Sequence, residues 1–123
     1  MKTQREILQW AVDTFGPCAR DRRERAMRFL EEALELAQAE GLEVRDVDRL
    51  MWRVFERPPG ETEQEIAGVH ITLASLSERA GIQISEAVEA EWRRIESKPP
   101  EYFQHKHADK VAEGVAAANS VGN

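Results

Sequence analysis

Residues 21–39, DRRERAMRFLEEALELAQA, carry the clearest secondary-structure pattern of the chain. Their apolar side chains recur three and four residues apart, which is the period of an amphipathic α-helix. These side chains are Met27, Leu30, Leu34 and Ala37, and Ala33 and Leu36 widen the stripe. Gly41 follows the last apolar position, where glycine commonly ends a helix. The stretch therefore predicts one long helix over about residues 21–39.

The rest of the chain repeats the helical period, and no run alternates β-branched or aromatic residues with polar ones as a strand does. Four further helices are predicted between Gly and Pro residues, at roughly 3–15, 45–56, 62–80 and 85–97. Thr62 and Ser85 are the predicted N-caps of the last two helices. The predicted fold class is all-α, a bundle of four to five helices.

The helix predicted over 62–80 differs in composition from the others. It carries no charged residue between Ile66 and Ser77. A helix that is apolar around most of its circumference is usually buried. In a chain of 123 residues, we expect part of this helix to be covered by a second subunit, and we predict a homodimer or homotetramer.

The length suits one domain, and the helical pattern weakens after Pro99-Pro100. We predict a single helical domain over residues 1–98. We expect residues 99–123 to form a C-terminal tail that is partly ordered, or that becomes helical when it binds a partner.

Composition and charge exclude several classes of protein. The chain has 17 basic and 23 acidic residues and a net charge of −6, which argues against nucleic acid as a partner because polyanion binding needs a dominant basic face. Cys18 is the single cysteine, so no intramolecular disulfide can form. No stretch approaches the roughly 20 apolar residues of a membrane span, and the first residues do not resemble an export signal. We expect a soluble, cytoplasmic protein without a membrane partner.

Three acidic residues crowd one turn of the helix predicted over 21–39: Glu31, Glu32 and Glu35. Like charges three and four residues apart on a helix repel each other. A bound divalent cation would offset this repulsion, and so would nearby arginines. The same three residues also fit an ordinary solvated face opposite the apolar stripe, so the pattern alone leaves both interpretations open.

A further acidic residue, Glu65, lies near the start of the helix predicted over 62–80. It belongs to the polar strip of that helix, which contains Glu61, Gly68, Thr72, Ser75 and Arg79. A polar strip on a buried helix typically faces a partner or a cavity. Equally, Glu65 can close a capping box with Thr62 and interact with the helix dipole.

The order Glu-Glu-x-x-Glu on one helix, followed beyond a connecting helix by a Glu that opens an apolar helix, resembles the MazG-like all-α nucleoside triphosphate pyrophosphohydrolases. This family is related to the dimeric dUTPases. The resemblance covers about residues 21–97 and is carried by RFLEEALELAQAEG (28–41) and PPGETEQEIAGVHITLASLSERAGI (58–82). It is greatest to short, stand-alone members found in phages and prophages.

The resemblance implies hydrolysis of a (d)NTP to the monophosphate and pyrophosphate, as in housecleaning of the nucleotide pool. It implies Mg²⁺ as the cofactor, with Mn²⁺ as a substitute, and assembly as a dimer or a dimer of dimers. Glu32 and Glu35 correspond to the first pair of metal ligands, Glu65 to the first ligand of the second pair, and Glu31 to the leading acid of the motif. Glu31 and Glu35 are the candidates for the carboxylate that accepts a proton from the attacking water.

The chain departs from the family pattern at Gly68, where the family has Asp. Mg²⁺ tolerates an incomplete octahedron badly, so water or Glu61, one turn before Glu65, would have to fill the position. The alternative function is that of a catalytically degenerate module that binds nucleotide or serves as a helical interaction module.

Four basic residues are candidates for phosphate binding. Arg25 and Arg28 belong to a basic cluster at the start of the helix predicted over 21–39, where guanidinium groups can bind a triphosphate or simply balance neighbouring carboxylates. Arg94 and Lys98 lie where family members carry a phosphate-binding series, although the series here lacks Asn.

Overall fold

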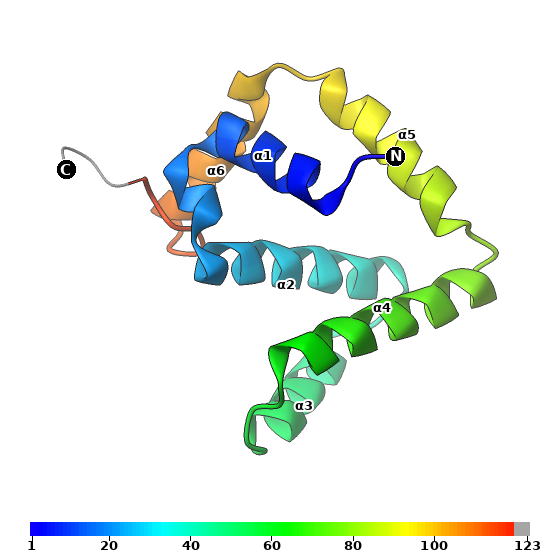
Figure 1. Cartoon of the computed structure of the whole chain (residues 1–123). Helices are drawn as coiled ribbons and strands as arrows, with labels where there is room; N and C mark the ends of the chain where they lie inside the picture. The colour runs from blue at the N-terminus through cyan, green and yellow to red at the C-terminus, as the bar shows by residue number, and fades with distance from the viewer. Residues whose placement is uncertain (120–123) are drawn as a thin grey trace. The chain divides into compact units, whose positions relative to one another are not determined.

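The computed structural model describes residues 1–119, in which all regular structure is helical (Figure 1). The elements are α1 (Gln4–Phe15), the 3-10 turn η1 (Pro17–Arg20), α2 (Arg22–Ala39), α3 (Val44–Phe55), α4 (Thr62–Arg79), α5 (Ile84–Glu96) and α6 (Pro100–Ala112). The prediction of an all-α fold is confirmed, and the bundle type stays a prediction. Within residues 1–119, no helix combines the length and the apolar character needed to cross a membrane.

Local capping explains where α1 and α2 begin. Thr3 caps α1 through a capping box, and the Asp21 side chain accepts a hydrogen bond from a backbone N–H in the first turn of α2. The predicted caps Thr62 and Ser85 are wrong, because both residues lie inside their helices. The N-cap of α4 is Glu61, one residue earlier than predicted, since the carbonyl of Glu61 already accepts the first helical hydrogen bond.

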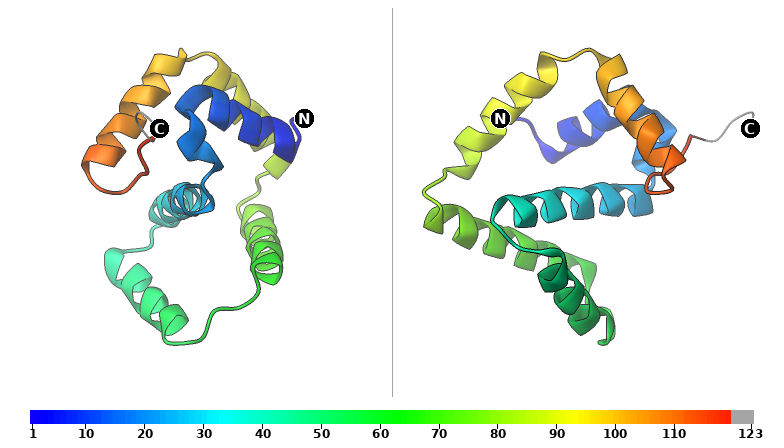
Figure 2. Two further views of the ribbon diagram at one scale, coloured as in Figure 1. Left: turned by 60° about the vertical axis from the view of Figure 1, so that its left-hand side comes forward. Right: turned by 180° about the vertical axis from the view of Figure 1, so that it is seen from behind.

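The described residues form two compact units, one of residues 1–41 with 97–119 and the other of residues 42–96. Within residues 1–119, extensive contact between elements is confined to the first unit. There α1 contacts η1 and α6, and α2 contacts η1. The views in Figure 2 show α6 beside α1, although the two helices are far apart in the sequence.

Aromatic rings join α1 to α6 in the first unit. Trp10 lies edge-on to Phe15 and to Phe103, with ring centroids 5.7 and 5.4 Å apart. The ring of His107 lies 5.4 Å from that of Phe15. Edge-to-face aromatic pairs at these separations are stabilising. Helix α6 is therefore an integral part of this unit.

The prediction of one helical domain over residues 1–98 with a tail over 99–123 stays a prediction, while the compact units of the described chain meet near residues 41 and 96. Residues 100–112 of the expected tail form α6, and Pro100 occupies the first position of that helix, where its missing N–H costs nothing. The sequence pattern missed this helix because the residues whose rings meet those of α1, Phe103 and His107, are only one pair, one turn apart, in a largely polar segment. Residues 120–123 of the expected tail lie outside the described residues.

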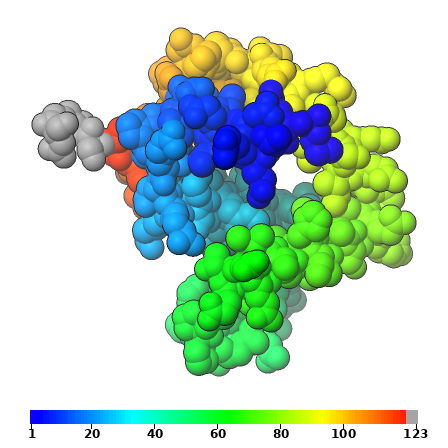
Figure 3. All heavy atoms as spheres, in the orientation of Figure 1, coloured from blue at the N-terminus to red at the C-terminus, as the bar shows by residue number. Residues whose placement is uncertain are grey.

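Helix α4, which the sequence predicts to be buried, is not covered within the described chain. None of its residues is buried, and Ile66 and Ile71 are 64% and 67% exposed. Figure 3 shows atoms of the first turns of α4 (green) at the surface of the second unit. The sequence argument placed the partner of this helix in a second subunit, and within residues 42–96 no element makes extensive contact with it.

Candidate functional site

Helix α2 presents the predicted first pair of metal ligands, Glu32 and Glu35. Both residues are exposed. Residues three apart on an α-helix are neighbours on one face, so the two carboxylates share a face that solvent reaches. Glu35 makes no hydrogen bond or ion pair with any residue of the described range 1–119.

The third acid of the cluster, Glu31, is held by α6. Its Oε1 lies 2.7 Å from Nζ of Lys110, and each side chain is 31% exposed. The hydrogen bond from Lys110 keeps the pKa of Glu31 below its usual value, against the opposing effect of burial, and the charges of Lys110 and Arg28 act in the same direction as the hydrogen bond. Glu31 is therefore a weaker proton acceptor than an ordinary glutamate, which favours Glu35 as the base.

The start of α4 carries the other two predicted ligands, Glu61 and Glu65, and both are exposed. The carboxylate of Glu65 folds back over Gly60, since a Cβ on Gly60 would lie 2.8 Å from its Oε1. Gly68 has open space around it, because a Cβ there would meet nothing within 4 Å. A carboxylate side chain at position 68 would therefore fit within this unit.

The predicted ligand set consists of carboxylate oxygens, the donor chemistry that Mg²⁺ and Mn²⁺ prefer. Over residues 1–119, however, no three His, Cys, Asp or Glu side chains come together in a way that can hold a metal ion. Glu32 and Glu35 belong to the first unit, and Glu61 and Glu65 to the second. Mg²⁺ commonly takes only one or two protein carboxylates and completes its coordination shell with water and substrate phosphate. The pair Glu32 and Glu35 supplies that number of carboxylates.

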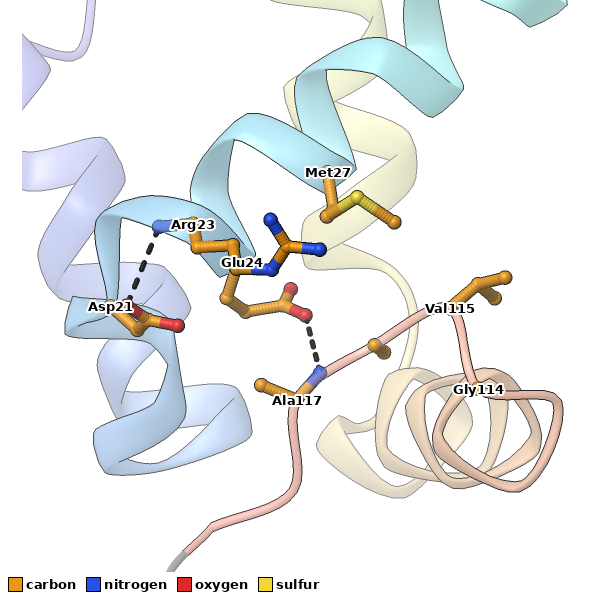
Figure 4. A pocket seen from close by; sticks show the side chains of 8 residues that line it. Asp21, Arg23, Glu24, Met27, Gly114, Val115 and Ala117 are labelled. Atoms are coloured by element: carbon orange, nitrogen blue, oxygen red, sulfur yellow. Dashed lines mark hydrogen bonds between the residues drawn. The ribbon is translucent and has the colours of Figure 1, made fainter.

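Arg25 and Arg28, two of the predicted phosphate-binding residues, surround a buried carboxylate. The side chain of Glu24 has no exposed area, and its Oε2 lies 3.2 Å from Nη2 of Arg25 and 3.5 Å from Nε of Arg28. Its Oε1 accepts a hydrogen bond of 2.8 Å from the backbone N–H of Ala117 (Figure 4). Arg28 Nη2 also donates to the carbonyl of Val115. Both arginines therefore belong to an internal network.

Sequence reasoning missed Glu24 as a member of this site. Its spacing of four residues from Arg28 is that of a helical ion pair, and that spacing was the available indication. The burial of the Glu24 carboxylate cannot be predicted from its neighbours in the sequence, because residues 114–117 cover it.

The other two predicted phosphate-binding residues have weak partners. Arg94 Nε lies 2.9 and 3.1 Å from the two carboxylate oxygens of Glu91, which holds the pKa of Glu91 below its usual value. Lys98 Nζ lies 5.2 Å from the ring centroid of Tyr102. Exposed pairs of this kind contribute about 0–1 kcal/mol, so a phosphate can replace either partner.

Comparison of the chain with protein-family models, with curated proteins and with solved structures finds no match. Function is therefore inferred from the residues of the chain itself.

Proposed function

We propose that this protein is a Mg²⁺-dependent pyrophosphohydrolase of the MazG-like type, which hydrolyses a (d)NTP to the monophosphate and pyrophosphate. The observation that carries the proposal is the exposed pair Glu32 and Glu35 on α2, in the Glu-Glu-x-x-Glu order of that family. Basic side chains hold the neighbouring acids Glu24 and Glu31, whereas Glu35 has no such partner in residues 1–119.

In this proposal Glu32 and Glu35 would hold Mg²⁺, and the family resemblance adds Glu61 and Glu65 as further ligands. When bound, Mg²⁺ would supply positive charge for phosphate oxygens and would make a coordinated water more acidic. Glu35 accepts the proton of the attacking water, a role for which Glu31 is less suited because Lys110 keeps it ionised. The phosphate-binding residues stabilise the charge that accumulates on the leaving pyrophosphate. They are Arg25, Arg28, Arg94 and Lys98.

Pyrophosphate release tests this proposal directly. The full chain is incubated with a panel of dNTPs and NTPs in the presence of Mg²⁺, of Mn²⁺, or of EDTA. We expect release with at least one nucleotide, and we expect it to stop when the metal is removed. No release with any nucleotide or metal would contradict the proposal. If nucleotides then still raised the melting temperature, the degenerate nucleotide-binding module, which Gly68 suggests, would take its place.

We also propose that the protein assembles as a homodimer, or as a homotetramer built from that dimer, through α4. Buried apolar side chains are few among residues 1–119, namely Ala11, Cys18, Ala19 and Trp92. Isolated helices are marginal in water, and large exposed apolar surfaces mark interfaces. A second copy is the fitting partner, because the segment from Ile66 to Ser77 carries no charge and can pack against its own copy without like-charge repulsion.

An Ile71→Glu variant is expected to shift the protein from its oligomer to the monomer. The new carboxylate would have to be desolvated in the interface, which is strongly unfavourable. Light scattering after size-exclusion chromatography measures the mass. The matched control is Ile7→Glu, which makes the same change on α1 at a residue that is 41% exposed, and it should leave the mass unchanged. A wild-type monomer, or an Ile71→Glu variant with unaltered mass, would refute assembly through α4.

A further inference from the structure

The chain that follows α6 folds back onto the N-terminal elements. We call residues 114–119 the C-terminal latch. It begins at Gly114, whose φ of 80° suits glycine at the end of a helix. Within the latch, the N–H of Ala117 donates to Glu24 (2.8 Å), and the carbonyl of Ala117 accepts from Nε2 of His107 (2.8 Å). Figure 4 shows the latch passing beside Glu24 and Met27 of α2.

Asn119 fastens the latch to the junction of α1 and η1. Its Oδ1 accepts from the backbone N–H of Cys18 and its Nδ2 donates to the carbonyl of Phe15, both at 2.7 Å. The absence of a side chain at Gly16 makes room for this amide, since a Cβ there would lie 2.8 Å from Nδ2 of Asn119. One side chain thus satisfies a backbone donor and a backbone acceptor at the place where the chain turns.

The latch also accepts a hydrogen bond from Arg28, but it leaves other N–H groups of that guanidinium without an acceptor. Nη2 of Arg28 donates to the carbonyl of Val115. Nη1 of Arg28 and Nε of Arg25 are buried and have no hydrogen-bond acceptor within residues 1–119, and Nε of Arg28 has only an ion pair with Glu24 at 3.5 Å. A buried donor without an acceptor is costly, and an anionic oxygen is a stronger partner for a guanidinium than a neutral carbonyl is. A ligand with several anionic oxygens would therefore suit Arg28 better than the latch does.

The surroundings of the latch indicate when such a ligand could enter. A cavity of about 150 Å³ lies between the latch and the start of α2, and the side chains of Asp21 and Glu24 are part of its lining. Asp21 and Glu24 bring two carboxylates to this lining and Arg23 brings one guanidinium, so the lining does not attract an anion while the Val115 carbonyl occupies Arg28. Withdrawal of the latch would remove the Val115 carbonyl from Nη2 of Arg28 and leave Nη1 and Nη2 available together, while Glu24 stays beside Nε.

We propose that the C-terminal latch is an autoinhibitory contact that competes with polyphosphate for Arg28. When the latch is closed, Arg28 donates to the Val115 carbonyl. When the latch is open, Nη1 and Nη2 of Arg28 can bind two phosphate oxygens, and Glu24 acts as a positioning residue beside Nε. This inference rests on the proposed function, because it assigns regulation to the phosphate-binding residues of the same site.

Opening of the latch and binding of polyphosphate are thermodynamically coupled, so the state of the latch can be measured without catalysis. A closed latch reduces the apparent affinity for polyphosphate by the fraction of molecules that are open, and polyphosphate in turn favours the open form. Cys18, whose backbone N–H binds Asn119, is 7% exposed. Its burial raises the pKa of the thiol, so closed molecules should react slowly with a thiol reagent.

Binding of inorganic tripolyphosphate without metal, measured by calorimetry, tests the inference. Asn119→Ala and a chain that ends at Glu113 both weaken the latch. We expect each to lower the Kd for tripolyphosphate about tenfold and to speed the labelling of Cys18 by a disulfide reagent. The matched control is Gln104→Ala, which removes another side-chain amide bonded to a carbonyl of α1, that of Thr14, and should change neither quantity.

Each outcome decides the inference. A Kd that is unchanged or raised in Asn119→Ala, or no binding of tripolyphosphate in any variant, overturns it. If circular dichroism shows that the shortened chain has lost its helices, Asn119→Ala decides alone. Addition of Arg28→Gln to Asn119→Ala should abolish the gain in affinity, and a gain that persists would overturn the role of Arg28.

The inference and the proposed function can fail separately. Latch-dependent binding of tripolyphosphate in a chain that releases no pyrophosphate would refute the enzyme and retain the latch. If the chain releases pyrophosphate but its Kd for tripolyphosphate is the same with and without the latch, the autoinhibitory role of the latch is refuted and the proposed enzymatic function stands.

Discussion

A Glu35→Gln variant is expected to release pyrophosphate about 10²–10⁴ times more slowly than the unaltered chain, which is the usual loss when a general base is removed. The amide has nearly the size of the carboxylate, and α2 keeps its helical propensity. What disappears is a negative charge that holds Mg²⁺ and a group that accepts a proton. The measurement is the initial rate of pyrophosphate release at saturating Mg²⁺ and nucleotide.

The matched control is Glu40→Gln, which makes the same substitution at the exposed C-cap of α2. It should keep the rate of the unaltered chain, because it lies more than one turn beyond the acidic cluster. Equal circular-dichroism spectra for the two variants would show that both retain their helices. Equal rates for Glu35→Gln and Glu40→Gln would exclude Glu35 from the reaction.

A Glu24→Ala variant is expected to lose about 3–5 kcal/mol of unfolding free energy, the cost of breaking a buried ion pair by removing one partner. The side chain of Glu24 is fully shielded from solvent. Its removal takes the Glu24 counterion from the guanidinium groups of Arg25 and Arg28, and it leaves the N–H of Ala117 without its acceptor. Urea unfolding followed by circular dichroism measures the change in midpoint and slope.

Two comparisons sharpen this result. Glu24→Gln keeps the size and an acceptor for Ala117, so it should lose less than Glu24→Ala. Glu40→Ala removes an exposed glutamate and should stay within about 0.5 kcal/mol of the unaltered chain. All variants must be compared at one protein concentration, because assembly raises apparent stability by mass action. A loss below about 1 kcal/mol for Glu24→Ala, the scale of an ordinary surface change, would show that the buried network does not stabilise the fold.

Most helix positions could be predicted from the sequence. The pattern over 21–39 corresponds to α2 at Arg22–Ala39, and the pattern over 45–56 to α3 at Val44–Phe55. A helix is a local structure, since its hydrogen bonds join residues four apart and its apolar stripe repeats within a few turns. The exposed pair Glu32 and Glu35 follows from the same local geometry.

Helix α6 could not be predicted in the same way. Its packing depends on Phe103 and His107 meeting the rings of α1, and one pair of residues a single turn apart is too short a pattern to predict a helix. The order of this segment is therefore a consequence of contacts made across the chain.

The pairing of the charges also depends on distant contacts. Glu24 is buried through Ala117, 93 residues away along the chain, and Glu31 is held by Lys110, 79 residues away. The charged residues of α2 follow one another in the sequence without any sign of their different surroundings. In the folded chain, Glu24 and Arg28 belong to a buried network, Glu31 pairs with Lys110 of α6, and Glu32 and Glu35 are exposed. Local periodicity determines which helix face a side chain occupies, whereas long-range contacts determine what covers that face and neutralises its charge.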